Sequence, residues 1–293
     1  MTLLTDPWQW WIAPFLDNGF MQRALLGGLL TAVTTAIVGT WVVLRGLTFL
    51  GDALAHGVLP GIAIAFLLGQ NTTLGALVAA AAMVGGISVV RSHSPLPDDA
   101  SIGILFVGFL ALAVVIMSTR RAAYTGDLNR FLFGSISGVE SDELIRQAVI
   151  AVVVAGGVLL LYRALLVMTF DETLARMLGL RPLLTHFALL ALIAVSIVGS
   201  FATVGNLLVF AFLVAPPAAA ALIANRVLVI MVLAIVLGAL ACVVGLLVSY
   251  HHRTAAGASM ALASVVLFFL VLTVTSLRRA LTARGAPDAG AIA

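Results

Sequence analysis

The sequence predicts an all-α integral membrane protein, a polytopic bundle of eight to nine transmembrane helices. Hydrophobic residues make up 62% of its 293 residues and charged residues only 9%, and the mean hydropathy is +1.20. This composition offers too little polar surface to cover a water-soluble globule. Apolar runs of about 20 residues recur along the chain, and each is long enough to cross a hydrocarbon core of about 30 Å as a helix.

Nine candidate spans follow from these apolar runs. They cover residues 24–44, 53–69, 73–90, 100–118, 144–167, 183–199, 207–224, 227–250 and 258–277. A re-entrant segment among them would reduce the count to eight. The pattern is weakest in the two spans on either side of residues 199–205, where small residues and a pair of prolines interrupt it.

The ends of the chain differ from this membrane domain, which we place at residues 24–278. Residues 1–23 contain Trp8, Trp10 and Trp11 and begin without a basic stretch, so we expect an interfacial segment and no cleaved signal peptide. Residues 279–293 end in small and polar residues, and we expect a disordered cytoplasmic tail.

The basic residues indicate topology. All 15 are arginine, and they lie in short loops and near the C-terminus. This distribution argues against nucleic-acid binding, and under the positive-inside rule it marks the cytoplasmic side of the membrane. Arg278, Arg279 and Arg284 place the C-terminus in the cytoplasm and, by counting back, the N-terminus outside. Other arginines, Arg253 among them, fall on the outer side against this assignment.

Two absences limit the chemistry. A P-loop requires a lysine on the phosphates, and the chain has none, so we expect no enzymatic activity and any ATP must be hydrolysed by a partner. The single cysteine, Cys242, allows neither a disulfide framework nor a thiolate cluster within one chain.

The segment GDALAHGVLPG places ionisable residues at membrane depth, where they are costly. Asp52 and His56 are four residues apart, so on a helix they share one face. A carboxylate and an imidazole suit zinc, manganese or ferrous iron as ligands. Pro60 lacks an N–H, which leaves the His56 carbonyl without its helical donor. In the alternative interpretation, Asp52 caps the helix and His56 bonds a neighbouring helix.

The segment VGNLLVFAFLVAPPAAAALI contains a second interruption. Pro216 and Pro217 release the carbonyls of Phe212 and Leu213, so we expect a bent helix. Broken helices in both halves of a transporter indicate its substrate path, and an ordinary kinked helix is the alternative.

The segment DETLARMLG predicts a short cytoplasmic helix within residues 168–182. Asp171 is a typical N-cap, Glu172 adds an acid to the first turn, Ala175 belongs to an Ala/Leu/Met face, and Gly179 stands where a C-cap belongs. Such a helix is suited to contact a soluble protein. A simple interfacial loop helix is the alternative.

These three segments, in this order, resemble the zinc and manganese permease family of ATP-binding cassette importers, and the likeness extends over residues 27–277. The segments DDASIGILF, DLNRFLFGSISGVESDEL and HHRTAAGASMAL are also similar to family segments. The resemblance implies a type II-like importer permease in the bacterial cytoplasmic membrane. It also implies a homodimer of permeases with two cytoplasmic ATPase subunits and an extracytoplasmic metal-binding protein.

The same resemblance implies roles for individual residues. Asp52 and His56 lie on the metal path, lined by the helix breaks at Pro60, Pro216 and Pro217. Asp171, Glu172, Ala175 and Gly179 belong to the coupling helix that enters the ATPase. The divalent metal is cargo, and no permanent cofactor is implied.

One position departs from the family pattern. Family members usually carry an acid followed by Thr just before the last span, whereas Arg253 precedes Thr254 here, beside His251 and His252. A cation near the outer mouth opposes a divalent cation, so a permease for a different substrate stays open. The two histidines are interpreted as solvated loop residues, with a role as ligands as the alternative.

Two further classes of protein are compatible with the residues. An ion-coupled secondary metal transporter would use Asp52 as its own coupling site. An intramembrane metalloenzyme would need a second cluster of ligands, but the sequence places no His, Cys, Asp or Glu three or four positions from His93 or His186.

Overall fold

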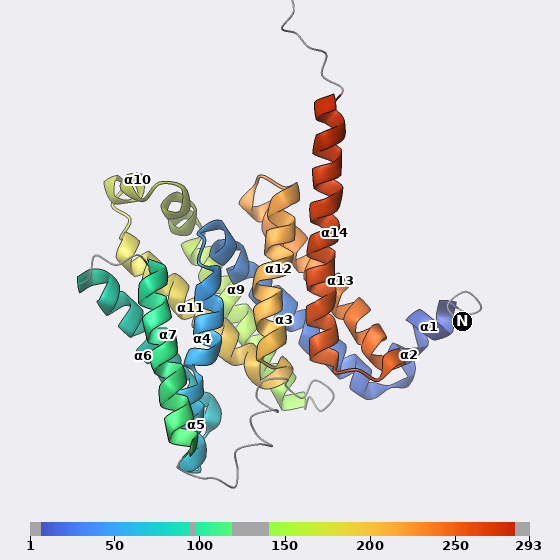
Figure 1. The fold of residues 1–293 in the computed structure, drawn as a ribbon, viewed down its shortest axis with the longest axis horizontal. Helices are drawn as coiled ribbons and strands as arrows, with labels where there is room; N and C mark the ends of the chain where they lie inside the picture. Colours follow the sequence, from blue (N-terminus) through green and yellow to red (C-terminus); the bar gives the residue numbers. More distant parts are fainter. Residues whose placement is uncertain (1–6, 94–97, 119–140, 285–293) are drawn as a thin grey trace, which may run out of the picture.

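A computed structural model describes residues 7–93, 98–118 and 141–284, and all secondary structure in these ranges is helical (Figure 1). The helices are α1 (Pro7–Trp11), α2 (Ala13–Asp17), α3 (Gly19–Leu44), α4 (Thr48–Gly57), α5 (Leu59–Leu67), α6 (Thr72–His93), α7 (Asp98–Ser118), α9 (Ser141–Phe170), α10 (Glu172–Met177), α11 (Pro182–Val204), α12 (Asn206–Ile223), α13 (Val227–His252) and α14 (Ala256–Arg284).

The predicted count of eight to nine spans is confirmed. Within the described residues, eight stretches are long and apolar enough to cross a membrane, and α4 and α5 together form one of them, Thr48–Leu67. The remaining predicted span, residues 207–224, corresponds to α12, whose apolar stretch Leu207–Ile223 is shorter. α12 follows Gly205, which has φ 81° and separates α11 from α12, so the shorter span belongs to the pair whose pattern is weakest in the sequence.

Several boundaries differ from the predicted ones. α3 already begins at Gly19, within the predicted interfacial segment, and α14 continues as a helix to Arg284. Residues 285–293 and most of the family-like segment DLNRFLFGSISGVESDEL lie outside the described residues. The second span starts at Thr48 instead of residue 53, because a glycine turn at Gly46 (φ 68°) ends α3 and starts α4.

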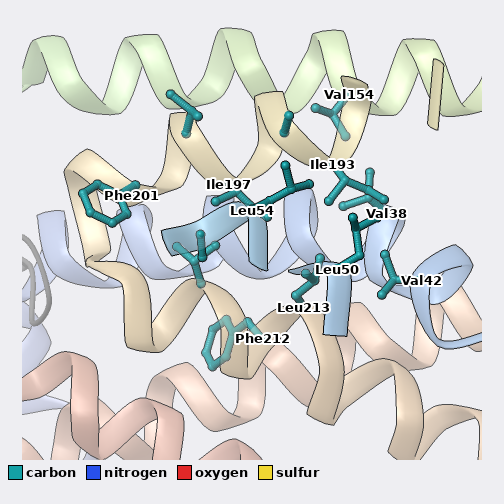
Figure 2. Packing of buried hydrophobic residues seen from close by; sticks show 14 of the residues in the cluster. Val38, Val42, Leu50, Leu54, Val154, Ile193, Ile197, Phe201, Phe212 and Leu213 are labelled. Atoms are coloured by element: carbon teal, nitrogen blue, oxygen red, sulfur yellow. The ribbon is translucent and has the colours of Figure 1, made fainter. Parts of the chain in front are cut away.

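The helices are arranged in an inner and an outer set. In the apolar stretch of α3, 67% of the residues are buried, and in that of the α4–α5 span 72% are. In the apolar stretches of α7 and α14, only 17% are buried. Leu50 and Leu54 of α4 pack among α3, α9, α11 and α12, as Figure 2 shows. The segment that carries Asp52 and His56 is therefore held in the interior of the bundle.

Glycines allow the inner helices to approach closely, as expected where lipid gives no hydrophobic drive for helix association. A Cβ atom at Gly39 of α3 would overlap the backbone carbonyl of Leu213 in α12. Gly61 of α5 and Gly75 of α6 face each other in the same way, each against the other's carbonyl.

The two ends of the bundle are distinct. α10 and the C-terminal end of α14 lie toward one end (Figure 1). α5 and the turn between α13 and α14 lie toward the other end. We call these the α10 end and the α5 end.

The close approach at Gly39 generates a first prediction. We expect Gly39→Ala to reduce stability by about 1–3 kcal/mol, because the added methyl group meets a backbone carbonyl that cannot move aside. Thermal unfolding of the purified protein in detergent would measure the change. Gly85→Ala is the matched control, since a Cβ there meets nothing within 4 Å. Equal midpoints of thermal unfolding for the two variants would contradict the close contact between Gly39 and the Leu213 carbonyl.

Candidate functional site

Asp52 and His56 share one face of α4, as the sequence predicted. His56 Nδ1 lies 3.4 Å from Asp52 Oδ1 and 3.1 Å from the Asp52 backbone oxygen. The two side chains are 26% and 32% exposed for His56 and Asp52, respectively. A backbone oxygen can only accept, so Nδ1 carries a proton, and in the neutral imidazole Nε2 has the lone pair that a metal ion would use.

The alternative roles for this pair do not match the geometry. The N-cap of α4 is Leu47, so Asp52 lies inside the helix and does not cap it. The polar contacts of His56 are to Asp52 in its own helix. Its ring meets Phe106 of α7 edge-on, with the ring centroids 5.8 Å apart, and this contact orients the imidazole.

The helix break at Pro60 is confirmed. α4 ends at Gly57, and Pro60 lies in the first turn of α5. The Val58 amide at the end of α4 donates to the Leu54 carbonyl at 3.3 Å, and Pro60 has no N–H to offer to the His56 carbonyl. The side chains of the site are one carboxylate and one imidazole per chain.

No group of three or more His, Cys, Asp or Glu side chains comes together in residues 7–93, 98–118 and 141–284. Two ligands from one chain form a weak site. Weak binding suits conduction, because a transported ion must leave as readily as it enters.

Pro216 and Pro217 do not break α12. The helix continues from Asn206 to Ile223 through both prolines, and both are buried. The Leu213 carbonyl, which Pro217 deprives of its donor, faces the backbone of Gly39. These prolines therefore belong to a helix interface, where neighbouring helices compensate for lost backbone bonds.

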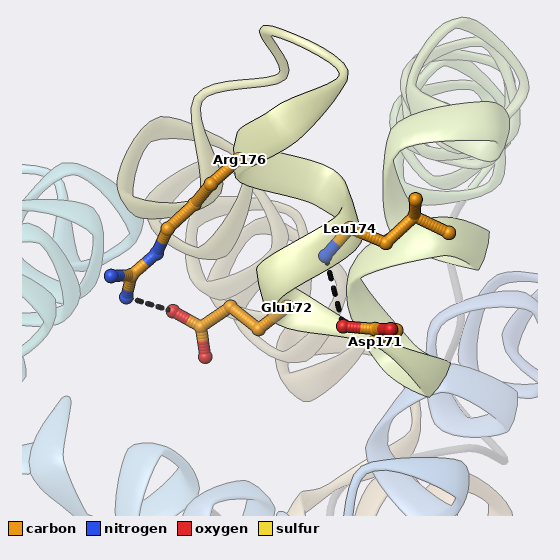
Figure 3. A network of polar contacts seen from close by, with 4 residues as sticks. All are labelled: Asp171, Glu172, Leu174 and Arg176. Carbon is orange, nitrogen blue, oxygen red and sulfur yellow. Dashed lines mark hydrogen bonds and ion pairs between the residues drawn. The ribbon is translucent and has the colours of Figure 1, made fainter.

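The capping predicted for the short cytoplasmic helix is confirmed in α10. Asp171 accepts a hydrogen bond from the Leu174 amide at 2.9 Å (Figure 3). Gly179, with φ 72°, donates to the Arg176 carbonyl, and Leu180 N donates to the Ala175 carbonyl at 3.0 Å. This pair of bonds is a Schellman motif, so both ends of the helix are stabilised.

The exposed face of α10 differs from the predicted one. Ala175 is only 1% exposed and faces the bundle, whereas Leu174, Met177 and Leu178 are 45%, 79% and 54% exposed. Glu172 forms an ion pair with Arg176 at 2.8 Å. Met177 could not be singled out from the sequence, because an Ala/Leu/Met face does not reveal which of its members turns inward.

The turn between α13 and α14 holds the departure from the family pattern. Arg253 is exposed and adopts a left-handed conformation with φ 55°. His251 is part of α13 and not of a loop, and its ring stacks on Trp10 with the centroids 4.0 Å apart. Its Nδ1 donates to the Leu247 carbonyl at 2.9 Å. Trp10 thereby ties the N-terminal segment to the α5 end of the bundle.

A bundle of membrane helices with an acid and an imidazole inside it, and a capped amphipathic helix at one end, defines the membrane subunit of a transporter. The chain belongs to the ABC 3 transport family, whose model matches residues 17–275. The fold class and the family predicted from the sequence are both confirmed.

Individual relatives show the same likeness. The manganese transport system membrane protein MntC of Listeria monocytogenes is 35% identical over 255 residues, which cover 87% of this chain and 90% of that protein. The manganese import system permease protein ScaB of Streptococcus parasanguinis is 36% identical over 264 residues, covering 89% and 93%. The solved structure of PsaBC from Streptococcus pneumoniae in complex with Fab matches with a TM-score of 0.79 and 31% identity, covering 89% of this chain and 94% of that one.

Proposed function

We propose that this chain is the permease subunit of an ATP-binding cassette importer that carries a divalent metal ion across the bacterial cytoplasmic membrane. The observation that carries the proposal is the Asp52–His56 pair, half-buried on an inner helix of an ABC 3 transport family member. Carboxylate and imidazole ligands suit manganese, zinc and ferrous iron. Manganese is the first ion to test, because MntC and ScaB are named as manganese transporters.

The importer works by alternating access. A metal-binding protein outside the cell delivers the ion to the α5 end, and Asp52 and His56 hold it briefly on its way. A homodimer brings two such pairs to one path, since a two-fold axis repeats each contact. Pro60 supports this role, because the helix break between α4 and α5 comes directly after His56 in the sequence.

The α10 end faces the cytoplasm in this proposal. α10 and the C-terminal end of α14, whose sequence contains Arg278 and Arg279, lie toward that end (Figure 1), in agreement with the positive-inside rule. A cytoplasmic ATPase subunit receives Leu174, Met177 and Leu178 in an apolar groove. Asp171, Glu172, Ala175 and Gly179 hold α10 in shape and place without entering the groove.

Reconstitution tests the function directly. We expect proteoliposomes that contain the permease, its ATPase and the metal-binding protein to take up Mn²⁺ only when ATP is present. Radioactive Mn²⁺ uptake and phosphate release would be measured together. Uptake by the permease alone under a proton or sodium gradient would instead establish an ion-coupled secondary carrier. ATP-driven uptake of another substrate, with none of Mn²⁺, Zn²⁺ or Fe²⁺, would assign a different cargo.

Replacement of the imidazole tests the metal path. We expect His56→Ala to reduce Mn²⁺ uptake to below about a tenth of wild type, since a charge-assisted ligand contact contributes about 1.5–3 kcal/mol. Assembly with the ATPase should be retained. His93→Ala is the matched control, because His93 Nδ1 also contacts the carbonyl four residues earlier, at 3.0 Å. Wild-type uptake by the His56 variant would remove the residue from the path.

The exposed face of α10 generates a separate prediction. We expect Met177→Asp to weaken stimulation of the ATPase at least about tenfold, because a buried apolar contact at the centre of an interface becomes a desolvated charge. Phosphate release with and without Mn²⁺ is the measurement. Met177→Leu should behave as wild type. Ala175→Asp should instead lower the thermal stability of the permease itself, since Ala175 faces the bundle. Unchanged stimulation in the Met177→Asp variant would disprove the contact.

A further inference from the structure

The turn between α3 and α4 is a rigid connection. Gly46 N donates to the Val43 carbonyl at 3.1 Å, and Leu47 N donates to the Val42 carbonyl at 2.8 Å. With Gly46 in the left-handed region, at φ 68°, these bonds form a Schellman motif. Leu47 is only 7% exposed and anchors the turn in the core. A displacement of Arg45, the C-cap residue of α3, is therefore passed on to the first turn of α4.

Arg45 reaches from this turn to another helix. Its Nη1 lies 3.3 Å from Nδ1 of His186, which is 6% exposed on α11. A guanidinium group only donates, so His186 Nδ1 accepts and the ring proton resides on Nε2. α11 follows α10 after a short connection that contains Gly179 and Arg181. The Arg45–His186 contact thus joins the helix after α10 to the turn before α4.

A pocket of about 350 Å³ at the α10 end brings the same residues together with α10 itself. It is lined by Arg45, Met168, Glu172, Arg176, Pro182, Leu183 and His186. The Glu172–Arg176 ion pair of α10 forms one part of the lining, and Arg45 with His186 forms another. α10 therefore has room to move on the side of this pocket, and the Arg45–His186 contact lies in the same lining.

We propose that Arg45 and His186 are positioning residues that transmit movement of α10 to α4, the helix that carries Asp52 and His56. The inference rests on the proposed function, because it assumes that an ATPase subunit moves α10. A push on α10 displaces the start of α11, His186 carries Arg45 with it, and the Schellman turn tilts α4. The ion pair of Glu172 with Arg176 keeps α10 a single body during this movement.

The test compares metal transported with ATP consumed. Arg45→Ala and His186→Ala would be assembled with the ATPase and the metal-binding protein in proteoliposomes supplied with Mn²⁺. We expect each variant to lower the ratio of Mn²⁺ transported to ATP hydrolysed by about tenfold, within the range known for coupling residues. ATP hydrolysis by the complex in the absence of metal should stay within about twofold of wild type. The double variant should be no worse than either single one, since both break one contact.

Two conservative variants separate this role from a structural one. Arg45→Lys keeps a cationic donor and His186→Gln keeps an acceptor, so both should recover most of the transport ratio. Arg226→Ala is the control, because Arg226 is exposed in the turn before α13 and does not line the pocket.

Each outcome decides between the possibilities. A wild-type ratio in Arg45→Ala and His186→Ala would overturn the inference while leaving the proposed function intact. Loss of assembly in all four variants would show a purely structural contact and would also overturn it. Failure of the wild-type complex to move Mn²⁺ with ATP would instead overturn the proposed function.

Discussion

Everything in this bundle depends on how a carboxylate and an imidazole are kept inside a membrane. Asp52 and His56 satisfy each other one helical turn apart on α4, and Phe106 of α7 contacts the imidazole from the side. The two side chains stay partly exposed, 26% for His56 and 32% for Asp52. Leu50 and Leu54 on α4 are fully buried against the inner helices. The apolar face of α4 therefore packs in the core, and Asp52 and His56 pair with each other outside it.

Two glycine turns connect helices of the bundle through short, hydrogen-bonded links. The ends of α3 and α10 both close with left-handed glycines, Gly46 and Gly179, and both turns pair the following amides with carbonyls of the last helical turn. Turns of this kind allow little change of angle without loss of two hydrogen bonds. In the mechanism that we propose, motion at the α10 end is therefore transferred between helices and not absorbed in flexible loops.

The sequence analysis was most accurate where local chemistry decides the structure. The caps of α10 followed from Asp171 and Gly179, since an N-cap oxygen and a left-handed glycine act within one turn of their own helix. The shared face of Asp52 and His56 followed from their spacing. Prediction from the sequence was wrong where the structure depended on contact with a helix distant in the sequence. Pro216 and Pro217 looked like a break, but α12 continues because α3 offers Gly39 beside the Leu213 carbonyl.

By itself, the sequence determined that the chain is a polytopic helical membrane protein with one candidate ligand pair and one capped helix, because hydropathy, spacing and capping act within a single segment. Only the tertiary structure decided that Ala175 turns inward while Met177 turns outward. It also decided that Arg45 meets His186 from a separate part of the chain. Which face of a helix is covered is set by the helices packed against it, and residues distant in sequence meet only when the fold brings them together.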